Sequence, residues 1–157
     1  MQPNIGIKPE NLTAVSHILN GILADEFLLY TKTRNAHWNV EGPDFHDKHK
    51  FFEAQYGQVE EFMDEVAERI RTLGHYAPAT LKEFLQLTRL TEAMREKNDS
   101  AGFMRELLAD HETIIIAMRE NIDRFANEYK DLGTSDFITG LMEEHEKMAW
   151  MLRSHLR

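Results

Sequence analysis

Five side chains in the first half of the chain have the chemistry to bind a metal ion together: His37, His49, Glu53, Asp64 and Glu68. The chain contains no cysteine, which excludes thiolate zinc sites, iron–sulfur clusters, disulfides and a cysteine nucleophile. Imidazole and carboxylate ligands without thiolate suit iron, manganese or zinc. Each side chain alone has an ordinary explanation, as part of a solvated helix face or as a histidine beside a turn. The prediction therefore depends on how the five residues are spaced.

Their spacing predicts a site that is shared between two chains. His49 and Glu53 are four residues apart on one predicted helix, and Asp64 and Glu68 repeat that spacing. A straight helix places residues 49 and 64 about 22 Å apart, which is too far for both pairs to bind one ion. An antiparallel second copy across a two-fold axis brings residue 49 opposite 68 and 53 opposite 64, with Gly57 near the closest approach of the two backbones. The alternative is that Gly57 is a packing glycine and that this polar face is solvated.

Apolar residues recur at three- and four-residue spacing through most of the chain, which predicts helices. We expect long helices over about 10–38, 45–73 and 101–130, and a fourth that is capped by Gly133–Asp136. A short helix is expected at Thr80-Leu81-Lys82-Glu83, a capping-box pattern inside the link at about 74–100. A link of that length can cross a bundle from end to end. The predicted fold class is therefore all-α, a ferritin-like four-helix bundle with a short extra helix between helices 2 and 3, in one domain over 1–157. The alternative is an up-down-up-down bundle with an excursion between those helices.

Other catalytic patterns and targeting segments are absent from the sequence. No histidine follows a glutamate by three residues, so the intrasubunit Glu-x-x-His di-iron signature is missing. His111-Glu112 does not continue as a zinc-protease motif, and no glycine-rich turn supports a serine triad or a phosphate loop. No apolar run predicts a membrane span, and the first residues lack a signal-peptide pattern, so we expect a cytoplasmic protein.

Four segments of the chain carry a more specific pattern. They are His37-Trp38-Asn39-x-x-Gly42-Pro43-x-Phe45-x-x-x-His49-x-x-Phe52-Glu53, Asp64-x-x-Ala67-Glu68-Arg69-Ile70-Arg71-x-Leu73-Gly74, Thr80-Leu81-Lys82-Glu83-Phe84 and His145-Glu146-Lys147-Met148-x-Trp150-Met151-Leu152. With them the chain resembles, over essentially its whole length, the Dps family of DNA-binding proteins from starved cells. The resemblance implies a ferritin-like subunit and a hollow shell of twelve subunits built from two-fold dimers. It also implies a ferroxidase that oxidises Fe(II), stores the Fe(III) mineral inside the shell and protects against oxidative stress.

The resemblance further implies that iron is the metal and that two subunits supply its ligands. One subunit would contribute His37, His49 and Glu53, and its mate would contribute Asp64 and Glu68. Many family members have Asp at the position of Glu53, which is one methylene longer. Hydrogen peroxide is the expected oxidant, while dioxygen and the number of metals per site stay open. Trp38, next to His37, is either an electron donor that quenches a one-electron oxidant or an anchor at the interface.

Charge distinguishes iron storage from DNA binding as the main function. Family members often move iron through acidic pores, for which the candidates here are Glu128, Asp131 and Asp136. Members that bind DNA commonly use lysine-rich tails, whereas residues 1–9 hold one basic residue, Lys8, and the formal net charge of the chain is −9. Because an acidic shell repels phosphate, we expect no DNA binding at neutral pH. A nucleoid-compacting shell is the alternative function.

Overall fold

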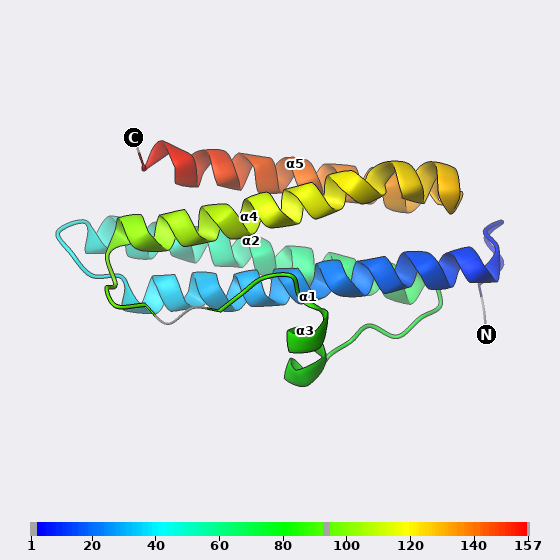
Figure 1. Ribbon diagram of the computed structural model, residues 1–157, viewed down its shortest axis with the longest axis horizontal. Coiled ribbons are helices and arrows are strands. Elements are labelled where there is room, and N and C mark those ends of the chain that lie inside the picture. The colour runs from blue at the N-terminus through cyan, green and yellow to red at the C-terminus, as the bar shows by residue number, and fades with distance from the viewer. Residues whose placement is uncertain (1–2, 93–94, 157) are drawn as a thin grey trace.

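The computed structural model describes residues 3–92 and 95–156, and over these residues the regular secondary structure is entirely helical (Figure 1). The elements in chain order are α1 (Pro9–Asn39), α2 (Phe45–Thr72), α3 (Leu81–Leu87), α4 (Ser100–Asp123), the π-helical turn η1 (Arg124–Glu128) and α5 (Leu132–Ser154). The helices α1, α2, α4 and α5 form a four-helix bundle, and the short α3 lies in the link between α2 and α4. The predicted all-α fold class is confirmed.

The link between α2 and α4 determines the topology of the bundle. It leaves the C-terminal end of α2, passes along α1 and begins α4 at the opposite end, so that α2 and α4 run in the same direction (Figure 1). This is the single long crossover of ferritin-like bundles, and the up-down-up-down alternative is wrong. The predicted capping box is also present, since Thr80 Oγ1 accepts from the Glu83 backbone N–H at 3.2 Å and the Glu83 carboxylate accepts from the Thr80 N–H at 3.1 Å.

Two buried charged side chains of α1 hold this crossover against the bundle. The Asp25 carboxylate accepts hydrogen bonds from the backbone N–H and from Nε of Arg89, both at 2.7 Å. Lys32 Nζ donates to the Thr91 carbonyl at 2.7 Å and lies 2.6 Å from Asp110 Oδ2 on α4. Because removing either partner would leave a buried charge unpaired, these contacts fix the path of the crossover strongly.

By length and composition alone, α1 is long and apolar enough to cross a membrane, although the sequence contains no uninterrupted apolar run of that length. Its apolar window is 61% buried inside the bundle, where Val15, Leu19 and Leu29 are completely covered. The helix packs against α2, α3 and α4. Contact on several sides explains its apolar composition, because a helix surrounded by neighbours loses the polar face of a surface helix.

The boundary between the last two long helices differs from the prediction. The α-helix α4 ends at Asp123, and residues 124–128 form a π-helical turn in place of further α-helical turns. Helix α5 begins at Leu132, and its N-cap is Asp131, whose carboxylate accepts from the Thr134 N–H at 2.9 Å. The predicted cap at Gly133–Asp136 was therefore wrong, and Asp136 lies inside α5 on an exposed position. Asp131 is the N-cap because it stands three residues before Thr134, whose backbone N–H in the first turn has no partner within the helix and needs a side-chain acceptor.

The same contacts bear on the candidate pore residues. Asp131 is only 2% exposed; its Oδ1 lies 3.0 Å from Arg69 Nη2, and its Oδ2 accepts from the Thr134 hydroxyl at 2.6 Å. Both carboxylate oxygens are thus used inside the subunit, which argues against a place in a pore wall. Glu128 is exposed and pairs with Arg124 at 3.0 Å. A pore role for Glu128 and Asp136 stays a prediction.

Replacing Asp131 by alanine is expected to lower the free energy of unfolding by about 2–3 kcal/mol, because it removes the α5 cap and leaves the Arg69 guanidinium without its partner. Denaturant unfolding at fixed subunit concentration measures the loss. Asp136→Ala is the matched control, an exposed aspartate one turn further along α5, and should stay within about 0.5 kcal/mol of wild type. A larger loss for Asp136→Ala than for Asp131→Ala would contradict this assignment of the cap.

Candidate metal site

The two predicted histidine ligands lie against each other where α1 passes into α2. His37 is in the last turn of α1 and His49 in the second turn of α2, and their rings stack with centroids 3.8 Å apart. Each Nδ1 lies 2.8 Å from the backbone carbonyl oxygen of the other residue. Because a carbonyl oxygen can only accept, both Nδ1 atoms carry the hydrogen. Each Nε2 is left as the electron-pair donor, the arrangement that a metal-ligating histidine needs.

The turn between α1 and α2, which connects the helix ends that carry these histidines, is hydrogen-bonded to the end of the crossover. The Glu41 backbone N–H donates to the Asn98 carbonyl at 2.9 Å, and the Ser100 hydroxyl donates to Asp44 Oδ2 at 2.7 Å. These contacts join the turn between α1 and α2 to the start of α4. The two imidazoles therefore lie on helix ends whose connection is braced by a third helix, which is the kind of support that a precise ligand site requires.

Glu53 lies one helical turn beyond His49 on α2, as the spacing predicted. Its Oε2 lies 2.7 Å from Lys50 Nζ, and both side chains are partly exposed. The hydrogen bond and the positive charge of Lys50 lower the pKa of Glu53 below its ordinary value. The carboxylate is therefore ionised at neutral pH and ready to act as a ligand. Sequence reasoning missed Lys50 as its partner, although the three-residue spacing was visible.

Asp64 and Glu68 lie on the second half of α2 and are exposed. Since α2 is one continuous helix from Phe45 to Thr72, the separation of about 22 Å between residues 49 and 64 holds in the fold. The structure thus brings His37 and His49 together, places Glu53 one helical turn beyond His49, and leaves the other two carboxylates apart from them. Within residues 3–92 and 95–156, no three His, Asp or Glu side chains converge well enough to hold a metal.

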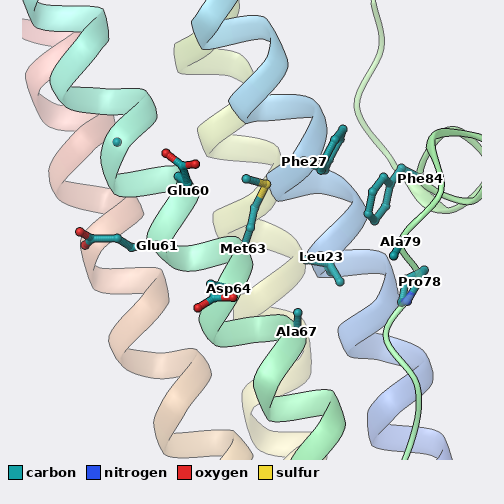
Figure 2. A pocket seen from close by; sticks show the side chains of 11 residues that line it. Leu23, Phe27, Glu60, Glu61, Met63, Asp64, Ala67, Pro78, Ala79 and Phe84 are labelled. Atoms are coloured by element: carbon teal, nitrogen blue, oxygen red, sulfur yellow. The ribbon is translucent and has the colours of Figure 1, made fainter.

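An open groove of about 750 Å³ runs beside the second half of α2. Its α2 wall includes Gly57 and Asp64, and Figure 2 shows Phe27 of α1 facing Phe84 of α3 on the opposite side, with the rings stacked at 4.3 Å. A Cβ added at Gly57 would meet no atom within 4 Å among the described residues. Gly57 therefore leaves open space at the point where a second α2 was predicted to approach most closely.

An aromatic cluster that the sequence reading missed lies next to His37. Trp38 is 63% exposed, and the Arg34 guanidinium lies over its ring at 4.9 Å and over the ring of Tyr56 at 4.4 Å. The Tyr56 ring meets His37 edge-on at 5.2 Å, and Tyr30 receives a hydrogen bond from Arg34 at 3.2 Å. The available signal was the four-residue spacing of Tyr30, Arg34 and Trp38 on α1. Trp38 is thus one of several oxidisable rings beside the predicted ligands.

A second polar group that the sequence reading missed lies inside the bundle. Glu26, His111 and His145 are completely buried, on α1, α4 and α5 respectively. Glu26 stands among the apolar residues of α1, and His145 continues the apolar stripe of α5. The signal was present as two titratable residues at core-facing positions, but only the packing of three helices shows that they meet.

Comparison with known proteins agrees with this architecture. The ferritin-like domain profile matches residues 16–157. An uncharacterized low temperature-induced protein of Nostoc sp. is 44% identical over 98% of this chain and 86% of its own length. The DNA protection during starvation protein 2 of Bacillus anthracis is 36% identical over 90% of this chain and 96% of its own length. A crystal structure of the Dps protein from Vibrio cholerae, described as a member of a broad superfamily of ferritin-like diiron-carboxylate proteins, superposes with a TM-score of 0.92 at 29% identity, covering 99% of this chain and 97% of the other.

Proposed function

The chain belongs to the Dps branch of the ferritin-like family, and from that premise we propose that it is a ferroxidase that stores iron and limits oxidative damage. Iron is its substrate and its cargo. The chain oxidises Fe(II) to Fe(III) at sites between two-fold related subunits and holds the product inside a shell of twelve subunits. We place this activity in the cytoplasm, a reducing compartment in which Fe(II) persists.

The observation that carries this proposal is the reciprocal contact between His37 and His49. Both imidazoles are oriented by backbone carbonyls at 2.8 Å, which directs both Nε2 atoms toward ligand binding. The ionised Glu53 completes the contribution of this subunit.

The remaining ligands in this proposal are the partner subunit's Asp64 and Glu68. Both are exposed and have no hydrogen-bond partner among the described side chains, and Asp64 lines the open groove beside Gly57. Two imidazoles and three carboxylates make an oxygen-rich ligand set, which favours the hard Fe(III) ion over Fe(II). Preferential binding of the product ion lowers the free energy of the oxidised state and so promotes oxidation.

Hydrogen peroxide is the oxidant in this proposal. Two Fe(II) ions each supply one electron, the O–O bond of one peroxide molecule breaks, and two protons complete two water molecules. Coupling both electrons to one peroxide avoids release of a one-electron product. If a single electron is transferred, Trp38, the residue directly after His37, is the exposed ring that can supply the second.

A crystal of the assembled protein soaked with Fe(II), measured with anomalous diffraction at the iron edge, tests the proposed site. We expect iron between His37 and His49 of one subunit and the partner subunit's Asp64 and Glu68, at two equivalent positions about a two-fold axis. Iron bound by residues of one chain alone, or located away from His37, would contradict the proposal. The same crystal gives the number of metals per site and the number of subunits.

We expect the apo shell not to shift plasmid DNA at pH 7.5 and about 0.15 M salt, since compaction needs many phosphate-neutralising cations. The chain instead carries nine more acidic than basic residues. Binding should appear only below about pH 6.5, where exposed histidines gain charge, or with a bridging divalent metal. The gel shift is run in parallel at pH 7.5, at pH 6 and with added divalent metal. A tight, salt-sensitive complex at pH 7.5 without metal would instead support the nucleoid-compacting alternative.

A further inference from the structure

Three titratable side chains meet in the interior of the bundle and take no part in the proposed iron chemistry. His145 Nε2 lies 2.8 Å from Glu26 Oε1, and His145 Nδ1 lies 2.9 Å from His111 Nδ1. All three residues have no exposed surface. Glu26 is eleven residues, or about 16 Å, along α1 from His37, so this group is separate from the candidate iron ligands.

The surroundings of the group contribute no further net charge. The fourth long helix, α2, places the uncharged ring of Phe62 at 5.2 Å from His145. On α1, the neighbouring Asp25 is paired with Arg89, and on α4 the neighbouring Asp110 is paired with Lys32. The charge of the group must therefore be balanced among its own three members.

Charge balance indicates how many protons the group holds. With both imidazoles neutral and Glu26 ionised, the bundle interior would contain one uncompensated negative charge, which is costly at a site shielded from water. One additional proton makes the group neutral overall, whereas a second would give it a net positive charge. His145 Nε2 has the Glu26 carboxylate at 2.8 Å, whereas no ion pair joins His111 to a carboxylate among the described residues, so a positive charge on the His111 ring would be uncompensated.

The distances favour a proton over a metal ion between these side chains. Two imidazole nitrogens bound to one metal at about 2.0–2.1 Å with tetrahedral angles stay about 3.3 Å apart. The two Nδ1 atoms lie closer than that, at 2.9 Å, which is a hydrogen-bond distance. The contact between the two rings requires a hydrogen on one Nδ1 and a lone pair on the other.

We propose that Glu26, His145 and His111 form a proton-binding site in the subunit core, which takes up one proton when the chain folds. The proton makes His145 a cation between the Glu26 carboxylate and a neutral His111, whose Nδ1 accepts from His145 Nδ1–H. This site couples the stability of the subunit to pH, independently of iron.

The dependence of subunit stability on pH has opposite signs above and below about pH 6.5. Above about pH 6.5 the unfolded chain has neutral imidazoles, so the folded chain holds one more proton and stability falls as pH rises. Below that pH both imidazoles of the unfolded chain are charged. In the folded chain, burial and the nearby His145 hold the pKa of His111 well below its usual 6.5. The unfolded chain then holds one more proton, and stability falls as pH decreases. The contribution of the site is therefore greatest near pH 6.5.

Equilibrium unfolding of the assembled protein between pH 5 and 9, at one subunit concentration, tests the proposal with Glu26→Gln. The amide keeps the shape of the side chain but removes the charge that retains the proton. Between pH 7 and 9 the unfolding equilibrium constant per subunit of wild type should rise about tenfold more per pH unit than that of the variant. Glu143→Gln, the same change at an exposed position of α5, should keep the wild-type slope. Equal slopes for wild type and Glu26→Gln would overturn the proposal.

A neutron crystal structure of the wild-type shell near pD 8 provides a measurement that does not depend on the variant folding. We expect deuterium on both nitrogens of His145 and none on His111 Nδ1. A His145 ring with only one deuterium would overturn the proposal. Elemental analysis of the His37→Ala/His49→Ala shell tests the metal alternative, because stoichiometric metal that disappears with Glu26→Gln would mean a metal site in the core.

Discussion

Replacing His37 and His49 together by alanine is expected to slow peroxide-driven Fe(II) oxidation by at least about tenfold, the change that corresponds to about 1.4 kcal/mol in the activation barrier. The two rings stack with their centroids 3.8 Å apart, so a single replacement would also remove the packing partner of the remaining ring. The double variant avoids that ambiguity. Initial rates, measured by the absorbance of Fe(III) after mixing with peroxide, give the size of the effect.

The matched control for this prediction is His17→Ala, an exposed histidine on the same helix as His37. It should keep the wild-type rate, because it lies about 30 Å along α1 from His37. The shell of the double variant must remain assembled, which size-exclusion chromatography shows. An assembled double variant with an unchanged initial rate would exclude this pair as the oxidation site.

Mixing two inactive variants is expected to restore about one quarter of the wild-type rate if the ligands come from two subunits. One variant lacks His37 and His49, and the other lacks Asp64 and Glu68. After random exchange at equal amounts, half of the dimers contain one chain of each kind, and one of the two sites in such a dimer is complete. The separation of about 22 Å between residues 49 and 64 within one chain is the physical basis of this expectation.

Two different affinity tags show that mixed dimers have formed, and wild type carried through the same exchange gives the reference rate. Mixed assembly without any recovered oxidation would mean that each site draws all its ligands from one chain. Recovery close to that of wild type would also disagree, because the second site of each mixed dimer lacks both sets of ligands. The fraction recovered is therefore more informative than recovery itself.

Much of the fold and half of the candidate site could be predicted because the relevant signals are local. Helical periodicity placed α1 and α2 within about a residue of their observed bounds, and the short helix α3 formed at the capping box at Thr80 as expected. The four-residue spacing of His49 and Glu53 sets them one turn apart on any helix. The length of the link between α2 and α4 was enough to favour the single crossover.

Helix ends were harder to predict where several residues compete. Asp131 and Asp136 stand on either side of Gly133 and Thr134 in the sequence, and by residue type each aspartate could be the N-cap of α5. Asp131 is the cap because its other interaction, with Arg69 on α2, also holds it at the end of the bundle. That partner is distant in the sequence, and so the preference cannot be read from the local pattern.

Which residues share a helix face could be predicted from the order of the residues alone, since this follows from the backbone repeat of 3.6 residues per turn. The same order implies that His49 and Asp64 cannot bind one ion within a chain. The packing of the helices, by contrast, sets the backbone carbonyl of each of His37 and His49 against the ring of the other, and brings Glu26, His145 and His111 together in the core. Contacts between helices depend on the rotation and axial shift of each helix against its neighbours. These are set by the packing of many side chains at once and leave no trace in the spacing of any one segment.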